Sequence, residues 1–157
     1  MIYSRFISYN DIIKMLNRKD KIGIISCNAC ARECGVGGIV KADELVERLI
    51  SDGYTVTDEV VLQYACSEPV YQKARLHLDA DTLMVLACSA GEKCAQRLYP
   101  KKKVVKVTED GGLFITETEL GVVKIVVPFP GFEKGNEYDL STGRASLKKR
   151  IRLEDAT

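Results

Sequence analysis

The sequence predicts an α/β domain with a largely parallel sheet flanked by helices, followed by a C-terminal β-hairpin and tail. Apolar strand-like runs alternate with helix-like segments along residues 1–108, which is the pattern of strand–helix–strand units. The runs at 21–26 and 82–87 are apolar almost throughout, as expected for parallel strands buried on both faces. Beyond residue 108, two strand-like runs flank a short turn, which predicts the hairpin.

Length and composition are typical of a single globular domain. Of the 157 residues, 46% are hydrophobic and 29% are charged, so the chain can bury a core and disorder is not expected. The formal net charge is +1, which gives no overall attraction for nucleic acid or an anionic membrane. No apolar run reaches the roughly 18 residues of a membrane helix, and residues 1–6 lack the apolar segment of a secretory signal. We therefore expect a cytoplasmic protein without nucleic-acid or membrane partners.

Local signals mark the ends of the expected helices. Ser8 can cap the first helix, with Asp11 at the reciprocal position of a capping box, and Gly53 can end the second. Ser67 and Pro69 suit the first turn of the third helix. Together with the spacing of apolar residues, these signals predict helices over residues 9–18, 40–52, 67–78 and 90–98.

The apolar runs between these helices predict strands over residues 21–26, 54–57, 82–87 and 104–107. The run Val60-Val61-Leu62 either extends the second strand or forms a separate one, and the sequence leaves both possibilities open.

The C-terminal part has a different character. We expect hairpin strands at 113–118 and 122–127 around a turn at 119–121, and a polar tail beyond Gly135. The basic cluster at 148–152 is interpreted as part of a solvated tail, because the whole chain is near neutral. We divide the chain into a cysteine-rich α/β domain, residues 1–108, and a hairpin with its tail, residues 109–157, packed on the same domain.

Five cysteines follow the predicted strands of the α/β domain. Cys27, Cys30 and Cys34 come directly after the first strand, Cys66 lies in the connection after the second, and Cys88 follows the third. Parallel sheets carry their functional loops at the carboxyl ends of the strands. All five cysteines are therefore expected at one edge of the sheet, where they can share one site.

Clustered cysteines in a reducing compartment indicate metal or redox chemistry rather than disulfides. Iron–sulfur clusters usually take four cysteine thiolates, and Cys27, Cys30 and Cys34 with either Cys66 or Cys88 satisfy that number. Five candidates for four positions leave one spare cysteine, which the sequence does not identify. Zn²⁺ accepts the same thiolates, although zinc ribbons usually present two C-x2-C knuckles and this chain has one.

Other residues near these motifs have less specific interpretations. Gly35, Gly37 and Gly38 do not match a dinucleotide or Walker fingerprint, and we expect them to let the backbone approach a bound cluster closely. Cys94 falls on the apolar face of the helix at 90–98 and is interpreted as a core residue, with a thiol near the site as the alternative. His77 falls late in a predicted helix and is expected at the surface.

The cysteine motifs resemble those of a known family. The segments are Ser26-Cys27-Asn28-Ala29-Cys30 through Cys34-Gly35-Val36-Gly37-Gly38, then Cys66-Ser67-Glu68-Pro69, then Leu86-Ala87-Cys88-Ser89-Ala90-Gly91 and Leu98-Tyr99-Pro100. In order and approximate spacing, they resemble the small iron–sulfur subunit of methylene-tetrahydrofolate reductases from acetogens (the MetV type), over residues 8–108. The resemblance implies a Rossmann-like domain, a bound [4Fe–4S] cluster and electron transfer to a flavin-bearing catalytic partner. The chain has no cysteine after Cys94, so it lacks the family's C-terminal cysteine-rich region and no second cluster is expected.

Three functional hypotheses follow. The first is an accessory or electron-transfer protein with one iron–sulfur cluster, a non-catalytic subunit that works with a flavin-containing or iron–sulfur redox partner. The second is an enzyme that performs thiol, sulfur-transfer or cluster-based chemistry, which predicts an accessible thiol of low pKa. The third is a structural zinc module that binds another protein. The sequence identifies neither catalytic residues nor the oligomeric state.

Overall fold

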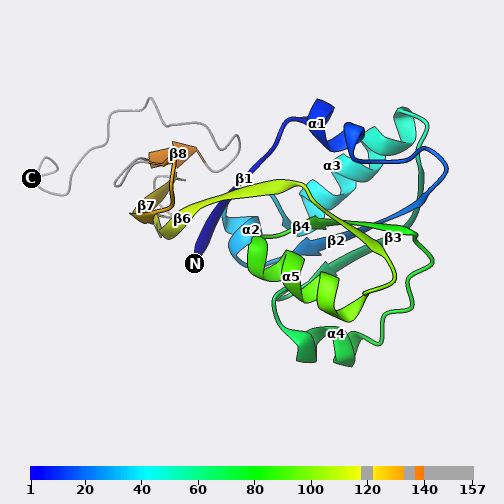
Figure 1. The fold of residues 1–157 in the computed structure, drawn as a ribbon. Coiled ribbons are helices and arrows are strands. Elements are labelled where there is room, and N and C mark those ends of the chain that lie inside the picture. Colours follow the sequence, from blue (N-terminus) through cyan, green and yellow to red (C-terminus); the bar gives the residue numbers. More distant parts are fainter. Residues whose placement is uncertain (118–121, 133–136, 140–157) are drawn as a thin grey trace, which may run out of the picture.

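The computed structural model describes residues 1–117, 122–132 and 137–139, and its centre is a four-stranded parallel sheet in the order β3-β2-β4-β5 (Figure 1). The strands are β2 (Lys21–Cys27), β3 (Thr55–Leu62), β4 (Thr82–Leu86) and β5 (Lys103–Lys106). This confirms a mixed α/β fold with a parallel sheet. Because β2 pairs with both β3 and β4, the loop after β2 lies between the loops that follow its two neighbours.

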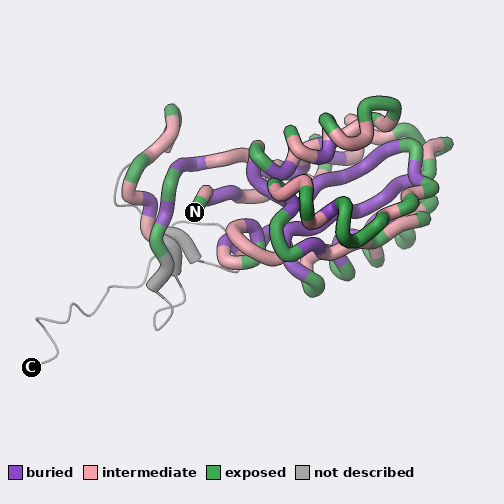
Figure 2. Tube along the Cα trace, turned by 90° about the horizontal axis from the view of Figure 1, so that it is seen from below, coloured by how far each residue is buried: buried purple, intermediate pink, exposed green. Residues whose placement is uncertain are grey.

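Helices cover both faces of this sheet, which gives three layers (Figure 1). α1 (Tyr9–Lys14) and α3 (Gly38–Ser51) share a core with Ile24, Met84 and Leu86. α4 (Glu68–Ala74) and α5 (Ser89–Leu98) share another core with Ile25 and Val85 on the opposite face. Successive residues of β2 and β4 thus enter different cores, as the two-residue period of a strand requires. Figure 2 shows the buried strands between helices with exposed outer sides.

A second, antiparallel sheet has the order β1-β6-β7-β8. Its strands are β1 (Ile2–Phe6), β6 (Thr108–Glu117), β7 (Val122–Pro128) and β8 (Glu137–Asp139). Tyr3, Phe114 and Ile125 are almost completely buried and belong to the same core cluster as Cys27 and Cys34. The second sheet therefore packs against the part of the domain that carries the cysteine loop.

Two predicted helix ends are confirmed by their hydrogen bonds, whereas Ser67 is the N-cap of α4 without a side-chain hydrogen bond to the helix. Ser8 is the N-cap of α1, and its hydroxyl oxygen accepts a hydrogen bond from the Asp11 amide at 3.1 Å. Gly53 follows α3 with a φ of +82°, and its amide donates to the carbonyl of Ile50. The Tyr54 amide donates to the Leu49 carbonyl, which completes a Schellman motif.

Other boundaries differ from the prediction. α1 ends at Lys14 instead of residue 18, and α4 ends at Ala74 instead of residue 78. Arg75 adopts a left-handed conformation with a φ of +47°, which turns the chain out of the helix, although Leu78 still packs against the core. The predicted position of His77 in a helix was therefore wrong. β3 is one strand, so the Val60–Leu62 run extends it.

Two elements were not predicted from the sequence. β1 pairs with β6, and Ile2 aligns with Leu113, so the partner strand of β1 lies more than a hundred residues away in the chain. α2 (Cys30–Glu33) is a four-residue helix inside the cysteine loop. The hairpin strands are confirmed by the pairing of β6 with β7. The predicted turn at 119–121, the polar tail beyond residue 140 and the basic cluster lie outside the described residues.

Candidate metal centre

The cysteines gather where three neighbouring strands of the parallel sheet end. Cys27 is the last residue of β2, and Cys30 begins α2 in the following loop. Cys66 lies between β3 and α4, and Cys88 is the N-cap of α5 directly after β4. The strand order reverses at β2: the next strand in sequence, β3, lies on one side of it, and the following strand, β4, lies on the other. Such switch points are the usual ligand sites of open parallel sheets.

Cys66 lies close enough to three other thiols to interact with them electrostatically, and Cys30 also lies within electrostatic range of Cys88. Burial raises the pKa of the Cys66 thiol, and the charges of Cys88, Cys27 and Cys30 raise it further. We call Cys27, Cys30, Cys66 and Cys88 the four-thiol set. Cys27 and Cys88 are buried, Cys30 is half-buried and Cys66 is exposed, so the set reaches from the core to the surface.

Cys88 differs from the other members in accepting backbone hydrogen bonds. Burial raises the pKa of its thiol, whereas hydrogen bonds from the amides of Gly91 and Ala90 lower it. Both amides belong to the first turn of α5, where backbone N–H groups lack partners within the helix. A Cβ at position 91 would lie 2.6 Å from the Ala87 Cβ, so glycine permits this close approach of α5 to the end of β4.

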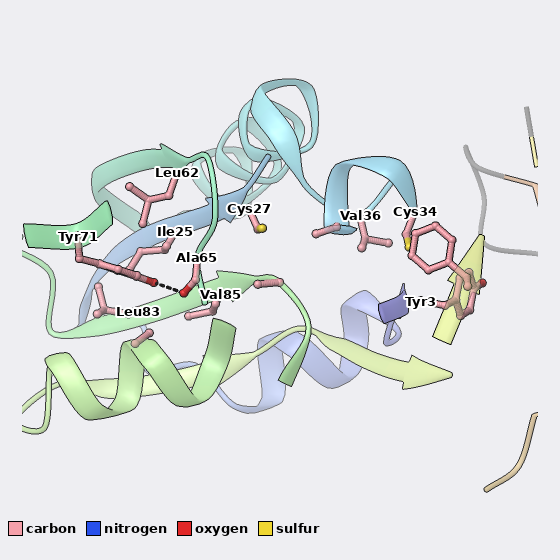
Figure 3. Packing of buried hydrophobic residues seen from close by; sticks show 14 of the residues in the cluster. Tyr3, Ile25, Cys27, Cys34, Val36, Leu62, Ala65, Tyr71, Leu83 and Val85 are labelled. Carbon is pink, nitrogen blue, oxygen red and sulfur yellow. Dashed lines mark hydrogen bonds between the residues drawn. The ribbon is translucent and has the colours of Figure 1, made fainter. Parts of the chain in front are cut away.

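Cys34 occupies a different environment from the four-thiol set. Its Sγ accepts a hydrogen bond from the Ser4 amide at 3.5 Å and donates to the Ile2 carbonyl at 3.7 Å, both in β1. Burial raises its pKa to about 12, because the thiolate would lose its hydration, and the charges of Cys30 and Cys88 raise it further. Cys34 therefore lies within electrostatic range of two members of the set, and its hydrogen bonds to β1 distinguish it from them. Figure 3 shows Cys34 at the Tyr3 end of the core cluster, with Val36 between it and Cys27.

The glycines of the cysteine loop have conformational and packing roles. Gly35 follows α2 with a φ of +71°, and its amide donates to the Arg32 carbonyl. The Val36 amide donates to the Ala31 carbonyl, so α2 ends in a Schellman motif.

Gly37 and Gly38 connect this loop to α3. A Cβ at position 37 would lie 2.6 Å from the Cys27 carbonyl oxygen and 2.7 Å from the Ala31 Cβ. Gly38 has a φ of +79°, and its carbonyl accepts a hydrogen bond from the buried Ser26 hydroxyl. These contacts fold the loop against its own strand, so they account for the glycines without a bound group.

Tyr71 is a residue of the site that sequence reasoning missed. Its ring is buried beneath α4, and its hydroxyl donates a hydrogen bond to the Ala65 carbonyl at 3.1 Å (Figure 3). Burial raises the pKa of Tyr71, and the charges of Cys94, Tyr99 and Cys27 raise it further. Tyr71 thus fixes the backbone next to Cys66.

Two residues interpreted separately from the sequence lie beside Tyr71. Cys94 is half-buried on α5 and packs against the core that contains Ile25 and Val85, which agrees with its interpretation as a core residue. His77 is exposed and lines a shallow groove of about 440 Å³ with Tyr71, Arg75 and Tyr99. The groove is open to solvent and lies on the α4 side of the domain.

Comparison with known proteins does not assign this chain to a family. No family model, no curated protein and no solved structure matches this chain. None of the helices in the described part of the chain combines the length and apolarity that a membrane-spanning helix needs.

The donor set suits a thiolate-bound metal group in the kind of its donors. Across residues 1–117, 122–132 and 137–139, no three His, Cys, Asp or Glu side chains are arranged to hold a single metal ion. The four-thiol set nevertheless places soft sulfur donors from three loops at one sheet edge, where two first-turn amides of α5 already donate to Cys88. Soft thiolates favour iron–sulfur clusters and Zn²⁺ over magnesium or calcium.

Proposed function

We propose that this chain is an iron–sulfur protein that holds a [4Fe–4S] cluster through Cys27, Cys30, Cys66 and Cys88. The observation that carries the proposal is the electrostatic proximity of these thiols at the carboxyl edge of three adjacent strands. A cluster of this kind takes four cysteine thiolates and supplies one-electron transfer.

Cys34 is the spare cysteine in this proposal. It already exchanges hydrogen bonds with the backbone of β1, and its raised pKa favours the neutral thiol. A thiolate ligand has to lose its proton, which the surroundings of Cys34 oppose. Burial also raises the pKa of Cys88, but hydrogen bonds from two amides oppose this shift.

The proposed biological role is electron transfer or an accessory function beside a redox partner that carries a flavin or an iron–sulfur centre. Cys66 is exposed, so the site approaches the surface on the side of the β3–α4 loop. Electrons would enter or leave there. This proposal includes a non-catalytic role in an oxidoreductase complex and a cytoplasmic location. It also includes a Rossmann-like fold and a relationship to the small subunit of methylene-tetrahydrofolate reductases.

The pKa directions of four cysteines argue against a nucleophilic thiol among them. Burial is the largest influence on Cys34, Cys66, Cys88 and Cys94, and it raises the pKa of each thiol. Nucleophilic cysteines need the opposite shift. A structural zinc ion would use the same four thiolates, so metal analysis has to separate these two functions.

Serine variants of the individual cysteines test the ligand assignment. Each single variant of the four-thiol set should lose most of its iron and acid-labile sulfide after anaerobic purification, because a serine hydroxyl is a poor ligand for these clusters. Cys34→Ser and Cys94→Ser are the matched controls and should keep the iron content of the wild type. A Cys34→Ser variant that loses iron while one of the four keeps it would refute the assignment.

A further inference from the structure

A buried carboxylate from the second sheet lies against the start of α5. Asp110 is in β6, and its side chain is only 9% exposed. One carboxylate oxygen, Oδ2, accepts a hydrogen bond from the Ser89 amide at 2.9 Å. The other, Oδ1, accepts a hydrogen bond from the Ser4 hydroxyl at 3.0 Å and lies 3.2 Å from the Lys106 ammonium nitrogen. Asp110 thus joins both sheets to the beginning of α5.

These contacts complete the hydrogen bonding of the first turn of α5. The Ser89 amide donates to Asp110, the amides of Ala90 and Gly91 donate to the Cys88 sulfur, and the Glu92 amide donates to the Cys88 carbonyl. A helix leaves its first four N–H groups without internal partners. Here the amides of Ser89, Ala90 and Gly91 have acceptors, and the sulfur of Cys88 is one of those acceptors, whereas the Glu92 bond is the first one within the helix ladder.

The orientation of Cys88 therefore depends on where the first turn of α5 is held. Lys106 donates a hydrogen bond to the Ser89 hydroxyl at 2.6 Å, which adds a second fixed contact to the residue next to Cys88. Burial would raise the pKa of Asp110, but hydrogen bonds from Ser89 and the charge of Lys106 outweigh it and hold the pKa below its ordinary value. Asp110 is thus a fixed negative charge close to the cysteine edge.

We propose that Asp110 is a positioning residue of the metal centre: it holds the first turn of α5 so that Cys88 faces the other three thiols, and its charge lowers the reduction potential of the bound cluster. The statement about the potential rests on the proposed iron–sulfur function, whereas the statement about Cys88 does not. The second sheet then contributes this carboxylate to the site.

Two substitutions separate geometry from charge. Asp110→Asn keeps a carbonyl oxygen that can accept from Ser89 and an amide group that can donate to the Ser4 oxygen, but it removes the charge. Asp110→Ala removes both. Glu109→Gln is the matched control, because this neighbouring carboxylate in β6 is half-exposed and pairs with Arg5 instead.

The first readout is the alkylation rate of each cysteine in the reduced, metal-free protein, measured by mass spectrometry. In Asp110→Ala, Cys88 should react about fivefold faster, because the loss of a helix cap promotes local opening. Cys94, in the same helix, should keep its rate, and Asp110→Asn should stay close to the wild type. An unchanged rate at Cys88, or an equal increase at Cys88 and Cys94, would overturn the positioning role.

The second readout is the reduction potential of the cluster. Asp110→Asn should have a more positive potential than Glu109→Gln, since removal of a nearby negative charge stabilises the reduced cluster. Equal potentials in the two variants would overturn the electrostatic part. A wild-type chain that binds no iron would refute the proposed function and the statement about the potential, and the alkylation rates would still decide the role of Asp110 at Cys88.

Discussion

Substitution of Gly37 tests whether the cysteine loop depends on close backbone packing. In Gly37→Ala, the new Cβ would meet the Cys27 carbonyl oxygen at 2.6 Å and the Ala31 Cβ at 2.7 Å. Ordinary carbon contacts are about 3.5–4.0 Å, so the loop would have to move by about 1 Å. The backbone φ of Gly37 is −148°, which suits alanine, so the cost comes from the contacts and not from the conformation.

The size of the effect follows from this overpacking. The Cys27 carbonyl belongs to the central strand and Ala31 is 1% exposed, so neither can move away cheaply. Overpacking of a buried site typically costs ~1–3 kcal/mol. For a chain of this length, each ~1 kcal/mol lowers Tm by about 2–4 °C. Gly37→Ala should therefore unfold roughly 3–10 °C below the wild type.

Thermal unfolding of the metal-free proteins, followed by circular dichroism, measures this difference. Val40→Ala is the control, because Val40 is 66% exposed in the first turn of α3 and its truncation should barely change Tm. A Gly37→Ala protein with the Tm of the wild type would refute the described packing between the loop and β2.

Three further changes probe other parts of the structure. Ile125→Ala should destabilise the metal-free protein by ~2–5 kcal/mol in urea unfolding, because Ile125 is fully buried in the core cluster that contains Tyr3 and Phe114; a cost below ~1 kcal/mol would contradict that burial. Tyr71→Phe should lower Tm by roughly 2–4 °C, since the Ala65 carbonyl loses its donor, and it should speed alkylation of Cys66; unchanged values for both would show that this hydrogen bond does not hold the loop. Cys34 should make stability fall at alkaline pH. Its folded pKa of about 12 exceeds the ordinary thiol value of about 8.5, so its contribution is complete below about pH 8.5 and is lost as pH rises toward 12. The free energy of unfolding should therefore fall more steeply with pH in the wild type than in Cys34→Ser between about pH 9 and 11, and parallel curves would contradict the raised pKa.

The parallel sheet and the helix starts could be predicted because their signals are local. The isoleucine-rich run at 22–25 is buried on both faces of β2, and the Ser8–Asp11 pair forms the expected cap of α1. β1 carried no such signal. Buried and exposed residues do not alternate along β1, and its register is set by pairing with β6, which lies far away in the sequence. Long-range pairing of this kind is decided by tertiary packing and not by local propensity.

The candidate site could be predicted in outline for the same reason. The convergence of Cys27, Cys66 and Cys88 follows from strand direction alone, which a sequence pattern reveals. The separate environment of Cys34 could not be predicted, because its hydrogen-bond partners belong to β1. The position of Asp110 near the site could not be predicted either. The predicted hairpin began only at residue 113, whereas the structure places Asp110 in β6 against the start of α5.

The central claim is that the four-thiol set holds an iron–sulfur cluster. The most direct measurement is anaerobic purification of the full chain, followed by an absorption spectrum and analysis of iron, acid-labile sulfide and zinc. If these thiols hold the cluster, the protein should contain about four irons and four sulfides per chain and show a broad band at about 400 nm that bleaches on reduction. A colourless protein with about one zinc ion and no sulfide per chain would contradict it and establish a structural zinc module. A protein that carries no metal after strict anaerobic work would contradict both metal assignments.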